Sequence, residues 1–382
     1  MIPYGRQTIG KDDIACVVKV LNSDFITQGP KIKEFEDVLC KYTGAKYAVC
    51  VSSGTAALHI ACLAAGIEKS DEVITSPITF VASANCVLYC GGKPVFADIE
   101  EDTVNISPQE IDRQVTKKTK AIIPVHFAGH PCDLKEIRNI AKKHNLIVIE
   151  DAAHALGAEY RGVKIGSGKY SDMTVFSFHP VKHITTGEGG AILTNKKRLY
   201  DRLLLFRNHG ITKDSRKFQR FDGPWYYEMQ ELGLNYRITD FQCALGVSQL
   251  KKLGQFLKRR REIVHMYNDR LEGLSGIVLP VEKHGVMSSW HLYPVRIQDR
   301  APMCRKRVFN YLRSKGIGVQ VHYLPVYLQP YYRDLGYKRG ICPYAEKFYA
   351  AEISLPLHPL LEDKDIEFIT GVLRTYFKRN EA

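Results

Sequence analysis

The sequence predicts an α/β protein, with a mostly parallel sheet in a large domain and a smaller α+β domain at the C-terminal end. Strand-like and helix-like segments alternate through roughly the first two-thirds of the chain, and the remainder follows a different order. The 382 residues suffice for more than one domain, and the 45% hydrophobic and 25% charged content is ordinary for globular proteins. We expect domains at 1–250, with an N-terminal arm, and at 251–382.

The large domain is predicted from short apolar runs separated by segments with helical spacing. Strands are expected at 47–51, 72–75, 93–97, 121–125, 146–149, 174–178 and 190–194. Helices are expected at 54–65, at 80–89, after the capping box Ser107-Pro108-Gln109-Glu110, and from Asp133 to about residue 144. Because parallel strands need a crossover between them, this alternation predicts βαβ units.

The last third combines long helices with fewer strands. One or two long helices are expected at 236–261, shorter helices at 305–315 and 366–377, and strands at 277–280, 291–297 and 318–322. This order is typical of a smaller α+β domain joined to the first through the long helices.

The net charge of +13 allows a nucleic acid, an anionic membrane or a phosphorylated metabolite as partner. No helix-turn-helix, RNP-type or zinc-finger pattern accompanies the charge, so we expect no nucleic-acid partner. No apolar run approaches the ~20 residues that span a bilayer, and the N-terminus lacks a signal-peptide core. The ten cysteines form no CxxC pair. These features favour a cytoplasmic protein without a membrane partner.

Two candidate ligand-binding features follow predicted strands, at the edge where open α/β sheets bind ligands. The small-residue loop Ser52-Ser53-Gly54-Thr55 opens a helix and presents N–H groups to an anion such as phosphate, unless it is an ordinary turn. Asp151 follows the strand at 146–149, where a buried carboxylate needs a cation or metal, unless it caps a turn at 152–156. His154 lies three residues further on.

Lys182 is the third feature, in a glycine-rich loop between two apolar strands. A lysine there can lose its hydration, have its pKa lowered and form a Schiff base with a carbonyl, although most loop lysines are simply solvated. A phosphate cradle, a strand-end carboxylate and a loop lysine are what pyridoxal phosphate needs for its phosphate, its pyridinium nitrogen and its aldehyde.

Other kinds of site are less well supported. The pairs His126/His130 and His179/His183 have HxxxH spacing, but they lie in strand-to-loop segments and lack the HExxH glutamate, so we expect no metal. No GxSxG elbow occurs, which argues against a Ser–His–Asp hydrolase.

Five motifs carry a family resemblance. They are Ser53-Gly54-Thr55-Ala56-Ala57-Leu58, Glu150-Asp151-Ala152-Ala153-His154-Ala155, the lysine loop at 177–190, Arg207-Asn208-His209-Gly210 and residues 234–244. With them the chain resembles, essentially end to end, the DegT/DnrJ/StrS family of sugar aminotransferases. The resemblance implies the PLP-dependent transferase fold type I, which is aspartate aminotransferase-like, and pyridoxal 5'-phosphate as the cofactor.

The resemblance also implies individual roles. Lys182 would be the catalytic, Schiff-base lysine, and Asp151 would hold the pyridinium nitrogen. Asn235 would reach the phosphate across a dimer interface, which implies a homodimer with shared active sites. The other implied cofactor-binding residues are Gly54, Thr55 and Ser177 at the phosphate, Phe80 stacked on the ring and His154 near the phenolic oxygen.

Within the family, the chain most resembles the members of pseudaminic acid biosynthesis that use L-glutamate to aminate C4 of a UDP-linked 4-keto-6-deoxy-N-acetylhexosamine. The nucleotide-sugar residues that this implies are Tyr4, Asp24, Phe25, Ile26, Thr27, Gly54, Ser177, Asn235, Gln320, Val321, His322 and Tyr323. The chain departs from these relatives at His183, where they often have Pro, at Asn208, where they have Ser, and in an extra stretch around 214–224.

Two alternatives stay open. The chain could aminate another 4-keto nucleotide sugar, such as the precursor of GDP-perosamine, legionaminic acid or bacillosamine. It could also be a non-catalytic PLP-binding regulator that uses its basic surface to bind nucleic acid. A cationic surface would equally attract an anionic nucleotide sugar.

Overall fold

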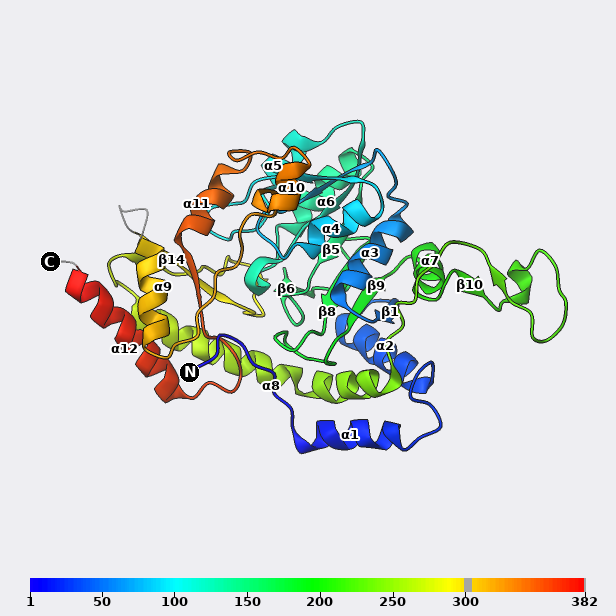
Figure 1. The fold of residues 1–382 in the computed structure, drawn as a ribbon, viewed down its shortest axis with the longest axis horizontal. Helices are drawn as coiled ribbons and strands as arrows, with labels where there is room; N and C mark the ends of the chain where they lie inside the picture. The colour runs from blue at the N-terminus through cyan, green and yellow to red at the C-terminus, as the bar shows by residue number, and fades with distance from the viewer. Residues whose placement is uncertain (299–303, 381–382) are drawn as a thin grey trace.

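A seven-stranded sheet forms the centre of the computed structural model, which describes residues 1–298 and 304–380 (Figure 1). Its strands are β1 (Tyr47–Val51), β2 (Glu72–Thr75), β3 (Lys93–Phe96), β4 (Thr119–Ile123), β5 (Ile147–Asp151), β8 (Met173–Ser177) and β9 (Gly190–Thr194). The seven strands predicted from the apolar runs therefore form, with bounds shifted by at most a few residues.

The strand order is β1-β9-β8-β5-β4-β2-β3, and the sheet is mostly parallel, as predicted. Strand β9 runs antiparallel to both of its neighbours, β1 and β8. The reason is the connection: β8 and β9 are joined by the loop that carries Lys182, and a parallel pair would need a longer crossover.

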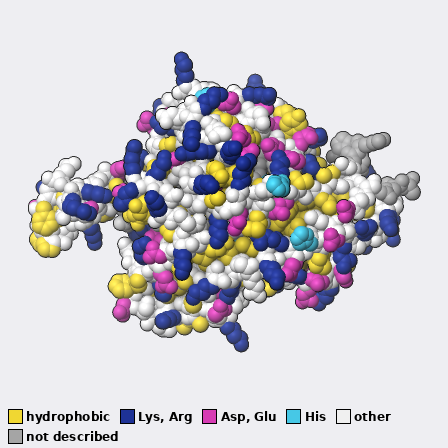
Figure 2. Space-filling view, turned by 180° about the vertical axis from the view of Figure 1, so that it is seen from behind, with side chains coloured by type: hydrophobic (Ala, Val, Ile, Leu, Met, Phe, Trp, Pro, Cys, Tyr) yellow, Lys and Arg dark blue, Asp and Glu magenta, His cyan; other side chains and the backbone are white. Residues whose placement is uncertain are grey.

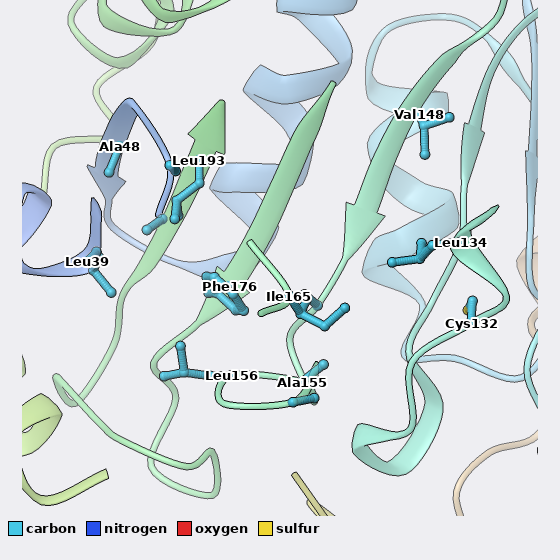
Figure 3. Close-up of a cluster of buried hydrophobic side chains, with 14 of the residues drawn as sticks. Leu39, Ala48, Cys132, Leu134, Val148, Ala155, Leu156, Ile165, Phe176 and Leu193 are labelled. Carbon is cyan, nitrogen blue, oxygen red and sulfur yellow. The ribbon is translucent and has the colours of Figure 1, made fainter. Parts of the chain in front are cut away.

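Both faces of the sheet are buried, because successive side chains of a strand point to opposite sides. On one face Val148 and Phe176 pack in a cluster with Leu39 (Figure 3). On the other face Ile149 and Val175 pack in a cluster with α3. Two buried faces explain why these strands have uninterrupted apolar runs rather than alternating ones.

Four helices of this part lie close to the predicted positions: α3 (Gly54–Ala65), α4 (Ala82–Tyr89), α5 (Pro108–Gln114) and α6 (Leu134–Lys143). Three further helices, for which the sequence analysis predicted none, are α1 (Lys11–Leu21), α2 (Pro30–Thr43) and α7 (Lys197–Arg207). Ser107 caps α5 by accepting from the Glu110 N–H, and Asp133 caps α6 by accepting from the Glu136 N–H. The helix expected at 80–89 begins at Ala82.

One long helix, α8 (Asp240–Leu271), leads into the C-terminal part. The strands and α-helices after it are β12 (Ile277–Val278), β13 (Val286–Met287), β14 (Tyr293–Ile297), α9 (Cys304–Ser314), α10 (Pro330–Asp334), α11 (Pro343–Ala351), β15 (Glu352–Leu355) and α12 (Asp363–Asn380). They include a three-stranded sheet of order β12-β14-β15. Helices and an antiparallel sheet in this part agree with the expected α+β character.

The strand predicted at 318–322 does not form, and that prediction was wrong. The segment makes a single bridge, between Gln320 and Ser354. The N-terminal arm lies against it instead, since the Gly318 N–H donates to the Ile2 carbonyl at 2.7 Å. The sequence analysis predicted no strand at β15. One edge of β15 makes the bridge to Gln320, and its opposite edge pairs with β14.

Helix α8 runs through the boundary expected at residue 250. Near its start, the Ser248 hydroxyl donates to Asp13 of α1 at 2.6 Å. Near its end, Arg270 donates to Glu367 of α12 at 2.7 Å. The same helix thus packs against elements of both parts, and the division into two domains stays a prediction.

A hairpin built on β10 (Ile211–Thr212) and β11 (Glu228–Met229) projects from the body of the molecule (Figures 1 and 2). Its exposed apolar side chains include Phe221, Trp225 and Tyr227. It contains the stretch around 214–224 that the sequence analysis singled out. Among the described residues, no helix combines the length and the apolar character needed to cross a membrane.

Candidate functional site

The predicted site residues converge at one edge of the central sheet. Strands β1, β8 and β5 run in the same direction, so their carboxyl ends meet there. Asp151 is the last residue of β5 and Ser177 is the last residue of β8, while the Ser53-Gly54-Thr55 loop follows β1. The fold therefore brings together three features that lie far apart in the sequence.

The loop after β1 is shaped as a helix N-terminus. The Ser53 hydroxyl caps α3 by accepting from the Ala56 N–H at 3.0 Å. The N–H groups of Gly54 and Thr55, in the first turn, have no partner within the helix, and the helix dipole favours an anion there. A Cβ on Gly54 would lie 2.9 Å from the Ser177 Cβ, so glycine allows the two segments to approach closely.

Asp151 is buried and held by two donors. The Ser83 hydroxyl donates to its Oδ2 at 2.6 Å, and the Ala153 N–H donates to its Oδ1 at 3.1 Å. The capping alternative is thus partly correct, although no helix forms at 152–156. Phe80 lies three residues before Ser83 and its side chain is exposed, with its backbone carbonyl accepting from the Ser83 N–H.

Lys182 lies in the loop between β8 and β9, where its N–H donates to the His179 carbonyl at 2.9 Å. Burial lowers the pKa of the Lys182 amine to about 8, and the negative charge of Asp151 acts in the opposite direction. A lysine with such a pKa carries a substantial neutral fraction near neutral pH, which is the form that attacks carbonyls.

Four buried histidines lie near enough to this lysine for its charge to affect their pKa values. The ring centroids of His154 and His291 are 4.3 Å apart, and those of His183 and His291 are 5.4 Å apart. Burial lowers the pKa of His154, His183 and His291 well below the usual value, and it lowers the pKa of His322 to about 3. The positive charge of Lys182 adds to each of these shifts. The imidazoles near the lysine are therefore neutral.

Three of the predicted nucleotide-sugar residues lie against this cluster. The Tyr4 ring lies 5.5 Å from the His322 ring, and Tyr323 contacts both the His322 ring and His154. The Tyr323 hydroxyl is 3.4 Å from the His154 Nε2. Burial raises the pKa of Tyr323, so this hydroxyl keeps its proton.

Other predicted residues lie elsewhere on this chain. Asp24, Phe25, Ile26 and Thr27 are exposed beside the start of α8, where the Asp240 N–H donates to the Ile26 carbonyl at 3.0 Å. Gln320 is also exposed, and Val321 is half-buried.

Asn235 is exposed as well, in a segment that lies beside the loop after β1 of the same chain. The backbone shows this placement, because the Ser52 N–H donates to the Tyr236 carbonyl at 2.9 Å.

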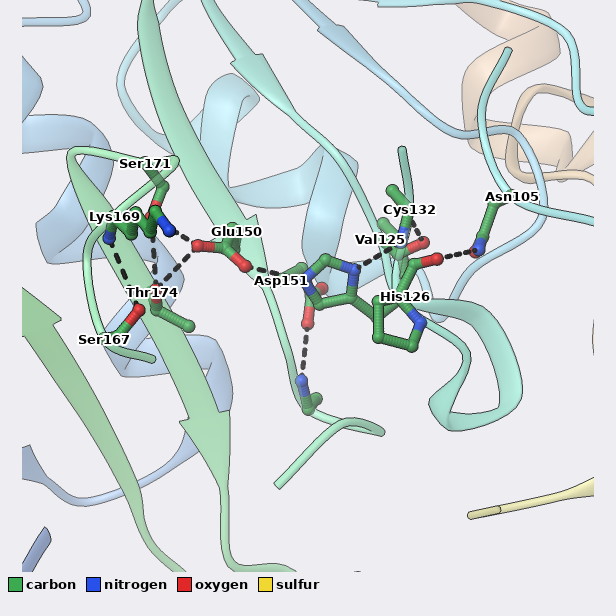
Figure 4. Close-up of polar contacts among 12 residues, drawn as sticks. Asn105, Val125, His126, Cys132, Glu150, Asp151, Ser167, Lys169, Ser171 and Thr174 are labelled. Carbon is green, nitrogen blue, oxygen red and sulfur yellow. Dashed lines mark hydrogen bonds and ion pairs between the residues drawn. The ribbon is translucent and has the colours of Figure 1, made fainter. Parts of the chain in front are cut away.

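The HxxxH spacings have structural explanations. His126 is buried, with Nε2 at 2.8 Å from Glu150 Oε2, and its Nδ1 accepts from the Cys132 N–H (Figure 4). His183 Nε2 is 3.0 Å from the Ser289 carbonyl. Within the described part of the chain, no group of three or more His, Cys, Asp or Glu side chains is placed to hold a metal ion.

Sequence reasoning missed several groups that complete the site. Ser83, which holds Asp151, lies 68 residues away from it in the chain. The sequence analysis gave His291 no role. It gave none to Glu352 and Ser354 either, and the structure places these two residues beside His322. These contacts join segments that only the fold brings together.

Comparison with known proteins agrees with this geometry. The model of the DegT/DnrJ/EryC1/StrS aminotransferase family matches residues 7–374. The uncharacterized protein MJ1066 of Methanocaldococcus jannaschii is 44% identical over 381 residues, covering 99% of this chain and 98% of that protein. The UDP-4-amino-4,6-dideoxy-N-acetyl-beta-L-altrosamine transaminase of Campylobacter jejuni subsp. jejuni serotype O:23/36 is 42% identical over 376 residues, covering 98% and 96%.

A solved structure is similar over the same length. Helicobacter pylori PseC, an aminotransferase involved in the biosynthesis of pseudoaminic acid, superimposes with a TM-score of 0.92 at 36% sequence identity. The match covers 99% of each chain.

Proposed function

The chain belongs to the DegT/DnrJ/EryC1/StrS family of aminotransferases, and from this premise we propose its substrates. It transfers an amino group from L-glutamate to C4 of UDP-2-acetamido-2,6-dideoxy-β-L-arabino-hexos-4-ulose. The product is UDP-4-amino-4,6-dideoxy-N-acetyl-β-L-altrosamine, for pseudaminic acid biosynthesis. The observation that carries this proposal is the end-to-end similarity to the Campylobacter jejuni transaminase, together with Tyr4, His322 and Tyr323 gathered beside His154.

The family uses pyridoxal 5'-phosphate, and the residues present fit it. The first turn of α3 offers free N–H groups at a position where a Cβ on Gly54 would intrude. The buried Nδ1 of His154 has no hydrogen-bond partner among the residues that the structure describes. We assign Gly54, Thr55 and Ser177 to the phosphate, Asp151 to the ring nitrogen, Phe80 to the ring face and His154 to the phenolic oxygen. When bound, the cofactor supplies an aldehyde that exchanges amino groups and a ring that accepts electrons.

Lys182 is assigned both the covalent link and the proton transfer. Its Nζ has a pKa of about 8, so near neutral pH it can take up a proton and return it without a large free-energy cost. The imidazoles of His154, His183 and His291 are neutral, so they add no positive charge near this nitrogen. Asp151, which accepts hydrogen bonds from the Ser83 hydroxyl and the Ala153 N–H, provides the carboxylate that a protonated ring nitrogen requires.

Gly54→Ala is expected to weaken cofactor binding by roughly tenfold, which corresponds to about 1.4 kcal/mol. The added methyl would lie 2.9 Å from the Ser177 Cβ and would push the phosphate-binding segments apart. Titration of the cofactor-free protein with pyridoxal phosphate, followed by absorbance, measures the dissociation constant. Gly254→Ala in α8 is the control, since its Cβ would meet nothing within 4 Å. Equal affinities for the two variants would contradict the assigned cradle.

We also propose a homodimer with shared active sites. Asp24, Phe25, Ile26, Thr27 and Asn235 are exposed on the single chain, as expected of residues that serve the site of a partner. Phe80 is 58% exposed at the edge of the site, which is unusual for a large aromatic side chain without a partner or ligand. We place the reaction in the cytoplasm, in keeping with nine described cysteines that are free thiols.

An assay with candidate keto-sugars tests the proposed substrate. Glutamate and the enzyme would be incubated side by side with the UDP-linked L-arabino ketone and with the keto precursors of GDP-perosamine, legionaminic acid and bacillosamine. Mass spectrometry is expected to show amination of the L-arabino ketone, with kcat/KM at least about tenfold above the others, because one unpaired polar group in the site costs that much. If the enzyme preferred another ketone, the proposed substrate would be wrong. If it aminated none of them, the result would favour the non-catalytic regulator.

A further inference from the structure

Three buried polar groups form a hydrogen-bonded chain that ends at His322. The Glu352 side chain is fully buried, and its Oε2 accepts from the backbone N–H of His322 at 2.8 Å. Its Oε1 lies 2.5 Å from the Ser354 hydroxyl, which in turn lies 2.8 Å from the Nδ1 of His322. The three side chains thus run from a sealed carboxyl group to an imidazole beside the predicted substrate residues.

Counting protons along this chain gives two arrangements. A hydroxyl has one hydrogen, so Ser354 donates in one direction and accepts from the other. If Glu352 is ionised, Ser354 donates to it and accepts from the Nδ1–H of His322, which leaves Nε2 as an acceptor. If Glu352 is protonated, it donates to Ser354, Ser354 donates to Nδ1, and His322 carries its hydrogen on Nε2.

The far nitrogen of His322 is available to a ligand. Nε2 has no hydrogen-bond partner within the described residues, and it is not among the polar atoms sealed from solvent. The Tyr4 ring and the Tyr323 ring lie beside the imidazole, at 5.5 Å and 4.8 Å between centroids. Tyr4, His322 and Tyr323 are all assigned above to the nucleotide sugar.

This inference therefore rests on the proposed function. We propose that Glu352, acting through Ser354, determines which ring nitrogen of His322 carries the hydrogen, and so whether His322 offers the nucleotide sugar a donor or an acceptor. Glu352 and Ser354 are positioning residues in this arrangement, and His322 is the residue that touches the substrate.

The surroundings of Glu352, Ser354 and His322 determine which of the two proton arrangements holds near neutral pH. Burial raises the pKa of Glu352 to about 8, against the opposing effects of its two hydrogen bonds and of Arg305 on α9. Below that pH the carboxyl is protonated, so His322 presents an Nε2–H donor, and above it His322 presents an acceptor. Burial, with the charge of Lys182, keeps the pKa of His322 at about 3, so the ring stays neutral in both arrangements. Tyr323 keeps its proton and does not compete.

Nitrogen NMR of the cofactor-free protein tests the proposal without any substrate. In protein labelled with 15N-histidine, His322→Gln identifies the resonances of His322, and the two nitrogens report which of them is protonated. The hydrogen is expected on Nε2 well below the pKa of Glu352 and on Nδ1 well above it.

Two variants interrupt the hydrogen bonds that connect Glu352 through Ser354 to His322, each in a different way. In Glu352→Gln the amide oxygen accepts from the His322 N–H and the amide nitrogen donates to Ser354, so His322 is expected to stay Nε2-protonated at both pH values. In Ser354→Ala the tautomer should no longer follow Glu352. Glu346→Gln, on α11, is the control, because Glu346 contacts Tyr327 and Gly340 rather than His322. A tautomer that is independent of pH in the wild type, or unchanged dependence in both variants, would overturn the proposal.

Kinetics supply a second readout. The KM for the UDP-linked ketone is expected to change about five- to tenfold as pH passes through the pKa of Glu352, because His322 changes from a hydrogen-bond donor to an acceptor toward the substrate. In Glu352→Gln the KM should stay constant, because the tautomer of His322 no longer changes. The KM for glutamate, normalised to the Glu346→Gln control, should show no such difference between wild type and variant. Absence of turnover with any nucleotide sugar would refute the proposed function, while the NMR result would still decide the tautomer.

Discussion

Replacing Lys182 by alanine is expected to lower the rate of transamination by at least about 10³-fold, the loss that follows removal of a positioned general acid–base group. Lys182 carries the amine with a pKa of about 8 at the edge of the sheet, opposite Asp151. The four imidazoles around it are neutral and much weaker bases, so they are poor substitutes for it. The glutamate half-reaction, followed by the visible absorption of the bound cofactor, measures the effect.

The spectrum separates loss of chemistry from loss of binding. Lys182→Ala should still bind pyridoxal phosphate through the cradle at Gly54 and Ser177, but without the yellow colour of the covalent link to the lysine. Lys169→Ala, an exposed lysine in the loop before β8, is the matched control and should behave as the wild type. A Lys182→Ala variant that glutamate converts at the wild-type rate would remove Lys182 from its assigned role.

The same substitution has a predictable effect on the stability of the cofactor-free protein. The folded state lowers the pKa of Lys182 from 10.5 to about 8, so it disfavours the protonated amine. That penalty is fully present below the folded pKa and disappears as pH rises toward the unfolded value. Lys182→Ala therefore removes an unfavourable contribution at neutral pH, and loss of activity in this variant should not be accompanied by loss of stability.

The strands were predictable because both faces of the central sheet are buried. Val148 and Ile149 pack into different clusters, so β5 appears in the sequence as an uninterrupted apolar run that ends at Asp151. Lys182 was predictable for a related reason, since a loop between two such runs must leave the sheet at its edge. The antiparallel direction of β9 depends on the connection, and the analysis of the sequence predicted no direction for that strand.

Partners that come together only in three dimensions were not predictable. Nothing near Ser83 in the sequence indicates that its hydroxyl contacts Asp151, because the contact depends on how α4 packs over the sheet. The failure at 318–322 has the same origin, since the N-terminal arm takes up the Gly318 N–H that a regular strand would have offered to a neighbour. The roles of Glu352 and Ser354 depend on that irregular segment, which carries His322.

Asp151→Asn is expected to lower the rate of transamination by about 10²- to 10³-fold, the usual loss when a preorganised electrostatic contact to the reacting group is removed. The amide is nearly the same size and can still accept from the Ala153 N–H, so the loop after β5 keeps its shape. What disappears is the negative charge. Steady-state and half-reaction rates with glutamate measure the loss.

Ser83→Ala provides the comparison that isolates the charge. It removes the 2.6 Å hydrogen bond to Asp151 but leaves the carboxylate in place, so a loss of at most about tenfold is expected. A second readout follows from electrostatics, because the charge of Asp151 raises the pKa of Lys182. In Asp151→Asn the pKa of Lys182 should fall further below 8. In the cofactor-free protein, the reaction of Lys182 with an amine-reactive reagent should therefore begin at lower pH. If Asp151→Asn and Ser83→Ala gave equal losses and no shift, hydrogen-bond geometry rather than charge would be the contribution of this carboxylate.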